Sequence, residues 1–182
     1  MIGAMRPTLV AVALCAGCSS PVDQVQSDAA KAIDADLSAT CLVKGNYDAL
    51  PAIAGTAAMV QGATTLTFVL DPGPPGKDDL FFRLVPNKGA FSAGLAPGTY
   101  TISGADANYT TCGLCTNLIA DITMQGPSKF YFASSGTVTL TSVTAPITGT
   151  AHDLAFTEID ISTGATNGPC VSHIASADFT AQ

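Results

Sequence analysis

The residues of this chain whose chemistry depends most on spacing are its six cysteines. Cys112 and Cys115 stand in the run CGLC, three positions apart with a glycine between them. Such a pair can serve as a dithiol redox centre, as half of a zinc site, or as a structural disulfide. The flanking residues, and the partners that the rest of the chain can supply, decide among these roles.

A thioredoxin-like redox pair needs a strand before it and a helix after it, because the helix N-terminus lowers the pKa of the first thiol. The run after Cys115, TNLIADITM (116–124), alternates apolar residues with period two and is typical of a strand. A thiol redox protein that uses Cys112 and Cys115 is therefore an alternative that the pattern does not favour.

A zinc site usually needs four ligands, either from two such pairs or from one pair and two histidines at short spacing. Apart from CAGC (15–18) near the N-terminus, the chain has one C-x-x-C run, and His152 and His173 stand 21 positions apart. Asp106 and Asn108 could offer oxygen atoms to calcium, but no D-x-D-x-D-G loop is present. We therefore expect no metal and no cofactor.

The chain begins MIGAMRPTLVAVALCAGCSS, in which Arg6 precedes a short apolar run and then small residues. This organisation is typical of a secretory signal, and the run is too short to cross a bilayer. The ending AGC resembles the lipobox of bacterial lipoproteins, with a departure at Cys15, where that family has leucine. The resemblance implies a signal peptide over 1–17 and lipidation of Cys18.

Lipidation would attach the protein to a membrane through acyl chains on Cys18 without a spanning segment. Residues 18–40 are polar, acidic and alanine-rich and are interpreted as a flexible tether. By the same resemblance, Ser19 carries no inner-membrane retention signal. We therefore expect an outer-membrane lipoprotein of the cell envelope, on the periplasmic face or the cell surface.

If Cys15 is removed with the signal peptide and Cys18 is acylated, four cysteines remain. An even number in an exported domain predicts two disulfides, and four cysteines permit three pairings. We favour Cys112–Cys115, because Gly113 allows a tight turn, together with Cys41–Cys170, which would join the two ends of the domain. The CGLC run is then interpreted as a clip in a turn.

From Cys41 onward, short runs of β-forming residues alternate with turns rich in glycine and proline. In TTLTFVLD (64–71) and LFFRLVP (80–86), Phe68 and Phe82 fall on the faces predicted to be inward. Eight or nine such strands without a core helix indicate an all-β domain over 41–182, and we favour an antiparallel two-sheet β-sandwich.

Two tyrosines are candidates for ligand contact. The run KFYFASSGTVTLTSV (129–143) predicts a hairpin in which Tyr131 faces away from Phe130 and Phe132. Tyr109 falls in a loop. Since the chain has no tryptophan, Tyr109 and Tyr131 are the aromatic residues we expect to be able to contact a ligand.

A combination of motifs in residues 95–182 resembles a group of uncharacterised bacterial cell-envelope lipoproteins. The motifs are PGTYTI, CGLC, YFASSGTVTLTS, ITGT and a late C-x-x-x-I-x-x-A-x-F. The resemblance implies a disulfide-containing β-sandwich in the cell envelope and no known activity.

The net charge of −7 and the lack of a basic cluster argue against a nucleic-acid partner. No G-x-S-x-G, H-E-x-x-H or phosphate-binding glycine loop is present, so we expect no catalytic residues and no enzyme. The favoured function is a surface interaction or adhesion module with an envelope protein or glycan as partner. A structural envelope component without a ligand, and a carbohydrate-binding module, are the alternatives.

Overall fold

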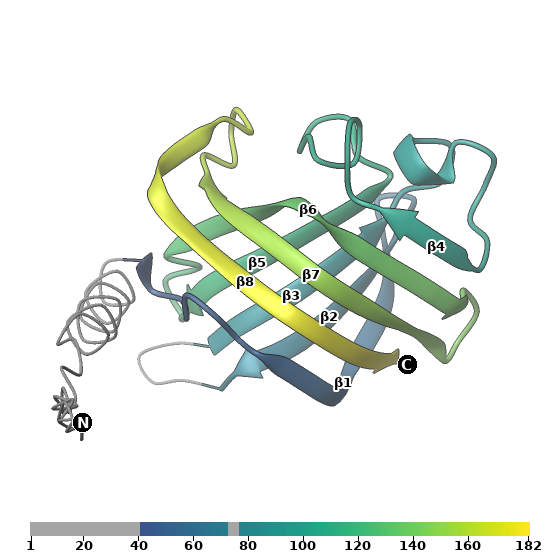
Figure 1. The fold of residues 1–182 in the computed structure, drawn as a ribbon, viewed down its shortest axis with the longest axis horizontal. Helices are drawn as coiled ribbons and strands as arrows, with labels where there is room; N and C mark the ends of the chain where they lie inside the picture. The colour runs from purple at the N-terminus through teal and green to yellow at the C-terminus, as the bar shows by residue number, and fades with distance from the viewer. Residues whose placement is uncertain (1–40, 73–76) are drawn as a thin grey trace, which may run out of the picture.

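The structure, a computed structural model, describes residues 41–72 and 77–182. The expected signal peptide (1–17), Cys18 and the whole of the tether (18–40) lie outside the described residues. Eight strands and a short 3-10 helix make up the domain (Figure 1). Their bounds are β1 (Ala49–Val60), β2 (Ala63–Asp71), β3 (Lys77–Leu84), η1 (Gly89–Phe91), β4 (Gly98–Thr101), β5 (Leu114–Ile122), β6 (Lys129–Ser142), β7 (Ile147–Ile159) and β8 (Thr166–Ala181).

Seven of these strands form a closed barrel. The hydrogen-bonded order is β6-β5-β3-β2-β1-β8-β7, and β7 pairs back to β6 over most of its length. In Figure 1, β7 and β8 cross in front of β2, β3 and β5. The first and last strands pair in parallel, from Ala49 with Ser176 to Gly55 with Ala181, and every other pair is antiparallel.

The predicted two-sheet sandwich is therefore wrong, although the all-β class is right. Alternating strands bury one face whether they form two stacked sheets or one sheet closed on itself. The β1–β8 and β6–β7 pairs distinguish the two architectures, because they join strands that would otherwise be edges. Closure satisfies the backbone groups that such edges would leave unpaired.

The eighth strand, β4, lies outside the ring and pairs only with β6. The first part of β6 pairs with β5, from Lys129 to Phe132, and a later part pairs with β4, from Thr137 to Leu140. The segment 102–113 connects β4 to β5. The segment leaves the sheet after β4 and rejoins it at β5, and Tyr109 within it lies on the outer surface of the barrel.

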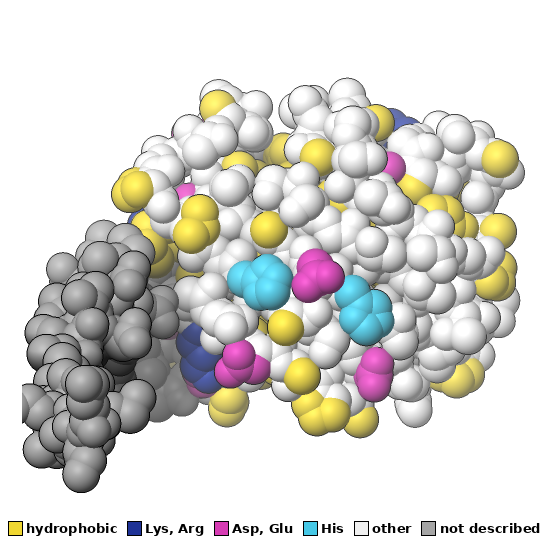
Figure 2. Space-filling model, viewed as in Figure 1, with side chains coloured by type: hydrophobic (Ala, Val, Ile, Leu, Met, Phe, Trp, Pro, Cys, Tyr) yellow, Lys and Arg dark blue, Asp and Glu magenta, His cyan; other side chains and the backbone are white. Residues whose placement is uncertain are grey.

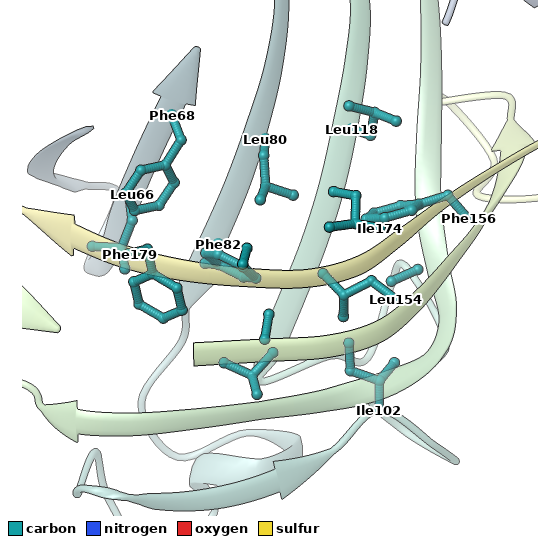
Figure 3. Close-up of a cluster of buried hydrophobic side chains, with 14 of the residues drawn as sticks. Leu66, Phe68, Leu80, Phe82, Ile102, Leu118, Leu154, Phe156, Ile174 and Phe179 are labelled. Carbon is teal, nitrogen blue, oxygen red and sulfur yellow. The ribbon is translucent and has the colours of Figure 1, made fainter. Parts of the chain in front are cut away.

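Side chains from all around the ring fill the barrel interior (Figure 3). Phe68, Phe82 and Phe179 are 0–3% exposed, and their ring centroids lie 5.0–5.9 Å apart. The inward positions of Phe68 and Phe82 confirm the alternation predicted for these two strands. Barrels of about eight strands have an interior just wide enough for side chains to fill, as observed here.

Tyr131 has the opposite orientation to the one expected for a ligand contact. Its side chain is fully buried in the barrel, and its hydroxyl donates a hydrogen bond to the carbonyl of Cys41. Phe130 and Phe132 point outward instead, since they pair with Ile119 and Asn117 of β5. A buried acceptor for its hydroxyl allows Tyr131 to occupy the core.

A polar cluster lies at one end of the barrel. The carboxylate of Asp78 accepts hydrogen bonds from the Tyr47 hydroxyl, at 2.6 Å, and from the backbone N–H of Asp121, at 2.9 Å. Burial raises the pKa of Asp78 above its ordinary value, although both hydrogen bonds lower it. Burial is also the main cause that raises the pKa of Tyr47 and of Tyr131.

Candidate functional site

The outer face of β2, β3, β5 and β6 is the floor of a groove. On β3, Phe81 and Arg83 point outward because the residues on either side of each, Leu80, Phe82 and Leu84, are fully buried in the barrel. Neighbouring strands extend this face in register. Arg83 pairs with Thr65 and Cys115, Phe81 pairs with Asn117, and Ile119 pairs with Phe130.

Arg83 is the cationic group of this groove. Its side chain is half-buried, and within residues 41–72 and 77–182 its guanidinium has no hydrogen-bond or ion-pair partner. Three of the four described lysines, Lys44, Lys77 and Lys129, each pair with a carboxylate at 2.8–3.3 Å, whereas Lys88 is exposed and lies outside the groove lining. A guanidinium has a planar set of donors that matches a carboxylate. Arg83 is therefore free to bind an anion.

Tyr109 forms one wall of the groove. It lies on the 102–113 segment, and its ring contacts the outward ring of Phe132 edge to face, with centroids 5.7 Å apart. Phe132, Cys112, Cys115 and Ile159 form a small buried cluster on the outside of the barrel. Tyr109 packs against this cluster, which fixes its position at the side of the groove.

The 102–113 segment is fixed by a carboxylate and a disulfide. Asp106 accepts hydrogen bonds from the backbone N–H groups of Gly113 and Leu114, at 2.8 and 2.9 Å. A Cβ at position 113 would lie 1.9 Å from the carbonyl oxygen of Lys88, so only glycine fits. Cys112 and Cys115 form the second disulfide directly after this contact. One carboxylate oxygen of Asp106, a residue considered for calcium, thus accepts both backbone hydrogen bonds.

A turn between β7 and β8 lies against Tyr109 and extends the rim of the groove. Ile161 lines the groove, and the backbone at Gly164 packs against Tyr109, where a Cβ would lie 3.1 Å from the Cβ of the tyrosine. The carboxylate of Asp160 accepts hydrogen bonds from Ser162 and from the Thr163 N–H. These hydrogen bonds lower the pKa of Asp160, and the bond from the Ser162 hydroxyl has the largest effect. They therefore favour the charged form of Asp160.

Together these elements enclose a groove of about 270 Å³. This is just below the usual size range of small-molecule pockets, roughly 300–1,000 Å³. Most of its surface is apolar, with one cation, one amide and two hydroxyl groups among the lining side chains. The lining residues are Thr65, Phe81, Arg83, Tyr109, Cys115, Asn117, Ile119, Phe130 and Ile161.

The structure contains both disulfides in the pairing expected from the sequence. Cys41–Cys170 joins residues 129 positions apart at one end of the barrel, and Cys112–Cys115 closes a turn beside the groove. Of the two expected ligand-contact tyrosines, Tyr109 lines the groove and Tyr131 does not. Cys18 lies outside the described residues.

Sequence reasoning did not find Phe81, Arg83, Asn117 and Phe130 as a group. One signal for them exists, since the alternation in LFFRL places Phe81 and Arg83 on the same outer face. Arg83 is also the only arginine after residue 17. The cross-strand neighbours could not be identified, because the pairing of β3 with β5 skips β4 and is a tertiary feature.

The two histidines lie on a different face, over β7 and β8. Figure 2 shows both histidine side chains with an acidic side chain between them. The Nε2 of His173 is 3.9 Å from a carboxylate oxygen of Asp153, and its Nδ1 is 3.4 Å from the Asn46 side-chain oxygen. Among the described residues, no group of three or more His, Cys, Asp or Glu side chains could hold a metal ion. His152 and Asp153 are exposed at the surface.

Comparison with protein-family models, with curated proteins and with solved structures finds no match to this chain. Within the described residues, no helix has the length and apolar character needed to span a membrane.

Proposed function

We propose that this protein is a lipid-anchored, non-catalytic binding module of the bacterial cell envelope that acts through the groove at Arg83. The observation that carries the proposal is the guanidinium of Arg83, which has no partner among the described residues and lies among aromatic side chains on a barrel wall held by a disulfide. A cation without a partner in an acidic protein is available to a ligand. Its surroundings limit the ligand to one that fits an apolar groove.

The groove also favours binding over a purely structural role. Aromatic side chains that stay partly open to solvent around a hollow separate an interaction module from an envelope component without a ligand, and the half-buried Tyr109, Phe81 and Phe130 line such a hollow. The titratable side chains of the lining are Arg83 and Tyr109. A guanidinium and a phenol suit the positioning of a ligand better than general acid–base chemistry at neutral pH.

The envelope location rests on the N-terminal sequence and is supported by the two disulfides, which persist in exported proteins. We expect Cys18→Ser to release the protein from the membrane fraction, because the acyl chains would have no attachment point. Cys15→Ser is the matched control and should stay in the membrane fraction. An unmodified Cys18 in the mass spectrum of the native N-terminus would contradict the proposed anchor.

A binding screen tests the groove itself. The lipidated full chain in lipid nanodiscs is titrated with small carboxylates, sugars, sugar acids and inorganic phosphate, and binding is followed by ligand-observed NMR. At least one class should bind to the wild-type protein and to Lys88→Gln, which removes an exposed charge outside the groove lining, and should lose binding in Arg83→Gln. If no class binds with this dependence, the groove is not a binding site and a structural role is favoured.

A further inference from the structure

The groove offers a single positive charge to a ligand. Arg83 is the only basic residue among its lining side chains. A ligand with two or more negative charges would leave part of its charge unpaired in mostly apolar surroundings, which is unfavourable. One carboxylate, in contrast, can form two parallel hydrogen bonds with the guanidinium fork. The charge of the groove therefore matches a monoanion.

Besides Arg83, two polar side chains lie on the floor of the groove. Thr65 is its neighbour on β2, and Asn117 lies on β5 opposite Phe81. The side-chain amide of Asn117 has no hydrogen-bond partner within the part of the chain that the structure describes. The groove can thus hold one anionic group and donate or accept one or two further hydrogen bonds.

The rest of the floor is apolar. Phe81, Ile119 and Phe130 lie on three adjacent strands of the floor, and Tyr109 and Ile161 stand above them. Phe81 is two residues from Arg83 on β3, which corresponds to about 7 Å along a strand. A ring attached directly to a carboxylate would extend over Phe81 when the carboxylate contacts Arg83. Flat apolar rings favour such contacts with aromatic side chains.

We infer that the groove binds small monocarboxylates with a flat apolar ring, with the carboxylate on Arg83 and the ring over Phe81, between Tyr109 and Phe130. This inference rests on the proposed function. A sugar acid would need partners for several hydroxyl groups, which the mostly apolar lining does not supply. A ring without an acid would leave the Arg83 guanidinium desolvated and unpaired.

The probe is 2-naphthoate, titrated into the lipidated full chain in nanodiscs and measured by ligand-observed NMR. Empty nanodiscs correct for partition of the probe into lipid. We expect binding to the wild-type protein and to Lys88→Gln, and at least tenfold weaker binding to Arg83→Gln. The neutral analogue 2-naphthalenemethanol should also bind at least tenfold more weakly than the acid.

Phe130→Ala is the second variant, since it keeps the cation and removes an aromatic wall. The substitution should weaken the binding of 2-naphthoate severalfold. Acetate has no ring, so we expect it to bind weakly and to bind equally to the wild-type protein and to Phe130→Ala. The melting temperature of each variant shows whether it is folded. If Arg83→Gln does not fold, Phe130→Ala and the neutral analogue still test the ring and the charge separately.

The outcomes distinguish this inference from the function on which it rests. If glucuronate or inorganic phosphate binds in an Arg83-dependent manner and naphthoate does not, the ligand class is wrong and the proposed binding function stands. If naphthoate binds equally to the wild-type protein and to Arg83→Gln, the assigned role of the guanidinium is wrong. If none of the probes binds, the proposed function fails together with the inference.

Discussion

The inside and the outside of the barrel wall contain the same kinds of residue and use them differently. Each has a cluster of aromatic side chains, and each has one disulfide. Inside, Phe68, Phe82 and Phe179 are buried and pack against one another in the core. Outside, Phe81 and Phe130 are only half-buried and line a groove whose guanidinium has no partner in the part of the chain that the structure describes.

The difference shows that the degree of burial, rather than the residue type, decides whether an aromatic side chain stabilises the fold or remains available to a ligand. Charged groups at the end of the barrel have protein partners, such as the pair between Lys129 and Glu158 at 2.9 Å. Arg83, on the outside of the same wall, has no such partner among the described residues. An interior group without a partner would destabilise the fold, whereas an exposed one keeps its hydration until a ligand replaces the water.

The largest expected difference concerns the two disulfides. Cys41→Ala/Cys170→Ala should reduce the free energy of unfolding by about 5 kcal/mol, because this bond closes a loop that includes almost the whole domain. Cys112→Ala/Cys115→Ala should lose about 2 kcal/mol, since its loop is very short. Urea unfolding without reductant measures both values. Equal losses would mean that the Cys112–Cys115 disulfide stabilises the barrel as much as the Cys41–Cys170 disulfide does.

The next comparison uses two adjacent residues of β3. Phe82→Ala should reduce the free energy of unfolding by roughly 3–5 kcal/mol, because its ring is fully buried among Phe68 and Phe179. Phe81→Ala should lose less than about 2 kcal/mol, since its ring is only partly removed from water. Thermal unfolding of both variants measures this. A larger loss for Phe81 would show that the outer face is also part of the core.

A smaller effect is expected at the polar end of the barrel. Burial raises the folded-state pKa of Asp78 above the ordinary value of 3.8, so the folded protein binds this proton more tightly than the unfolded chain. Stability is therefore lost as the pH rises above 3.8 through the folded pKa. Asp78→Asn removes this loss, and its free energy of unfolding relative to wild type should increase from pH 4 to pH 7.

Asn can still accept the hydrogen bond from the Asp121 N–H, so the variant keeps part of the native network. Asp71 and Asp121, whose charges also raise the pKa of Asp78, are present in both proteins. Asp160→Asn is the control for the method: hydrogen bonds from Ser162 lower the folded-state pKa of Asp160 below 3.8, so the wild-type protein loses this stabilisation as the pH falls below 3.8. The free energy of unfolding of Asp160→Asn relative to wild type should therefore stay nearly constant from pH 4 to pH 7 and should increase only below that range. A difference for Asp78→Asn that does not change with pH would contradict the assigned cause.

The sequence by itself determined the properties that depend on local pattern. Alternation in 64–71 and 80–86 was sufficient to place Phe68 and Phe82 inside, because successive strand residues point to opposite faces. The cysteine count predicted two disulfides, and Gly113 together with the separation of Cys41 and Cys170 favoured, among three possible pairings, the one that the structure contains. Neither property requires knowledge of which strands are neighbours.

Only the tertiary structure decided whether the sheet closes, which way Tyr131 points and where a ligand could bind. Both faces of 129–132 are aromatic, so the local pattern cannot select the inner one. Tyr131 points inward because the Cys41 carbonyl accepts a hydrogen bond from its hydroxyl. Phe132 can point outward because the ring of Tyr109 packs against it there. The groove likewise depends on pairing between strands far apart in the chain, because Arg83 acquires its neighbours only when β5 joins β3.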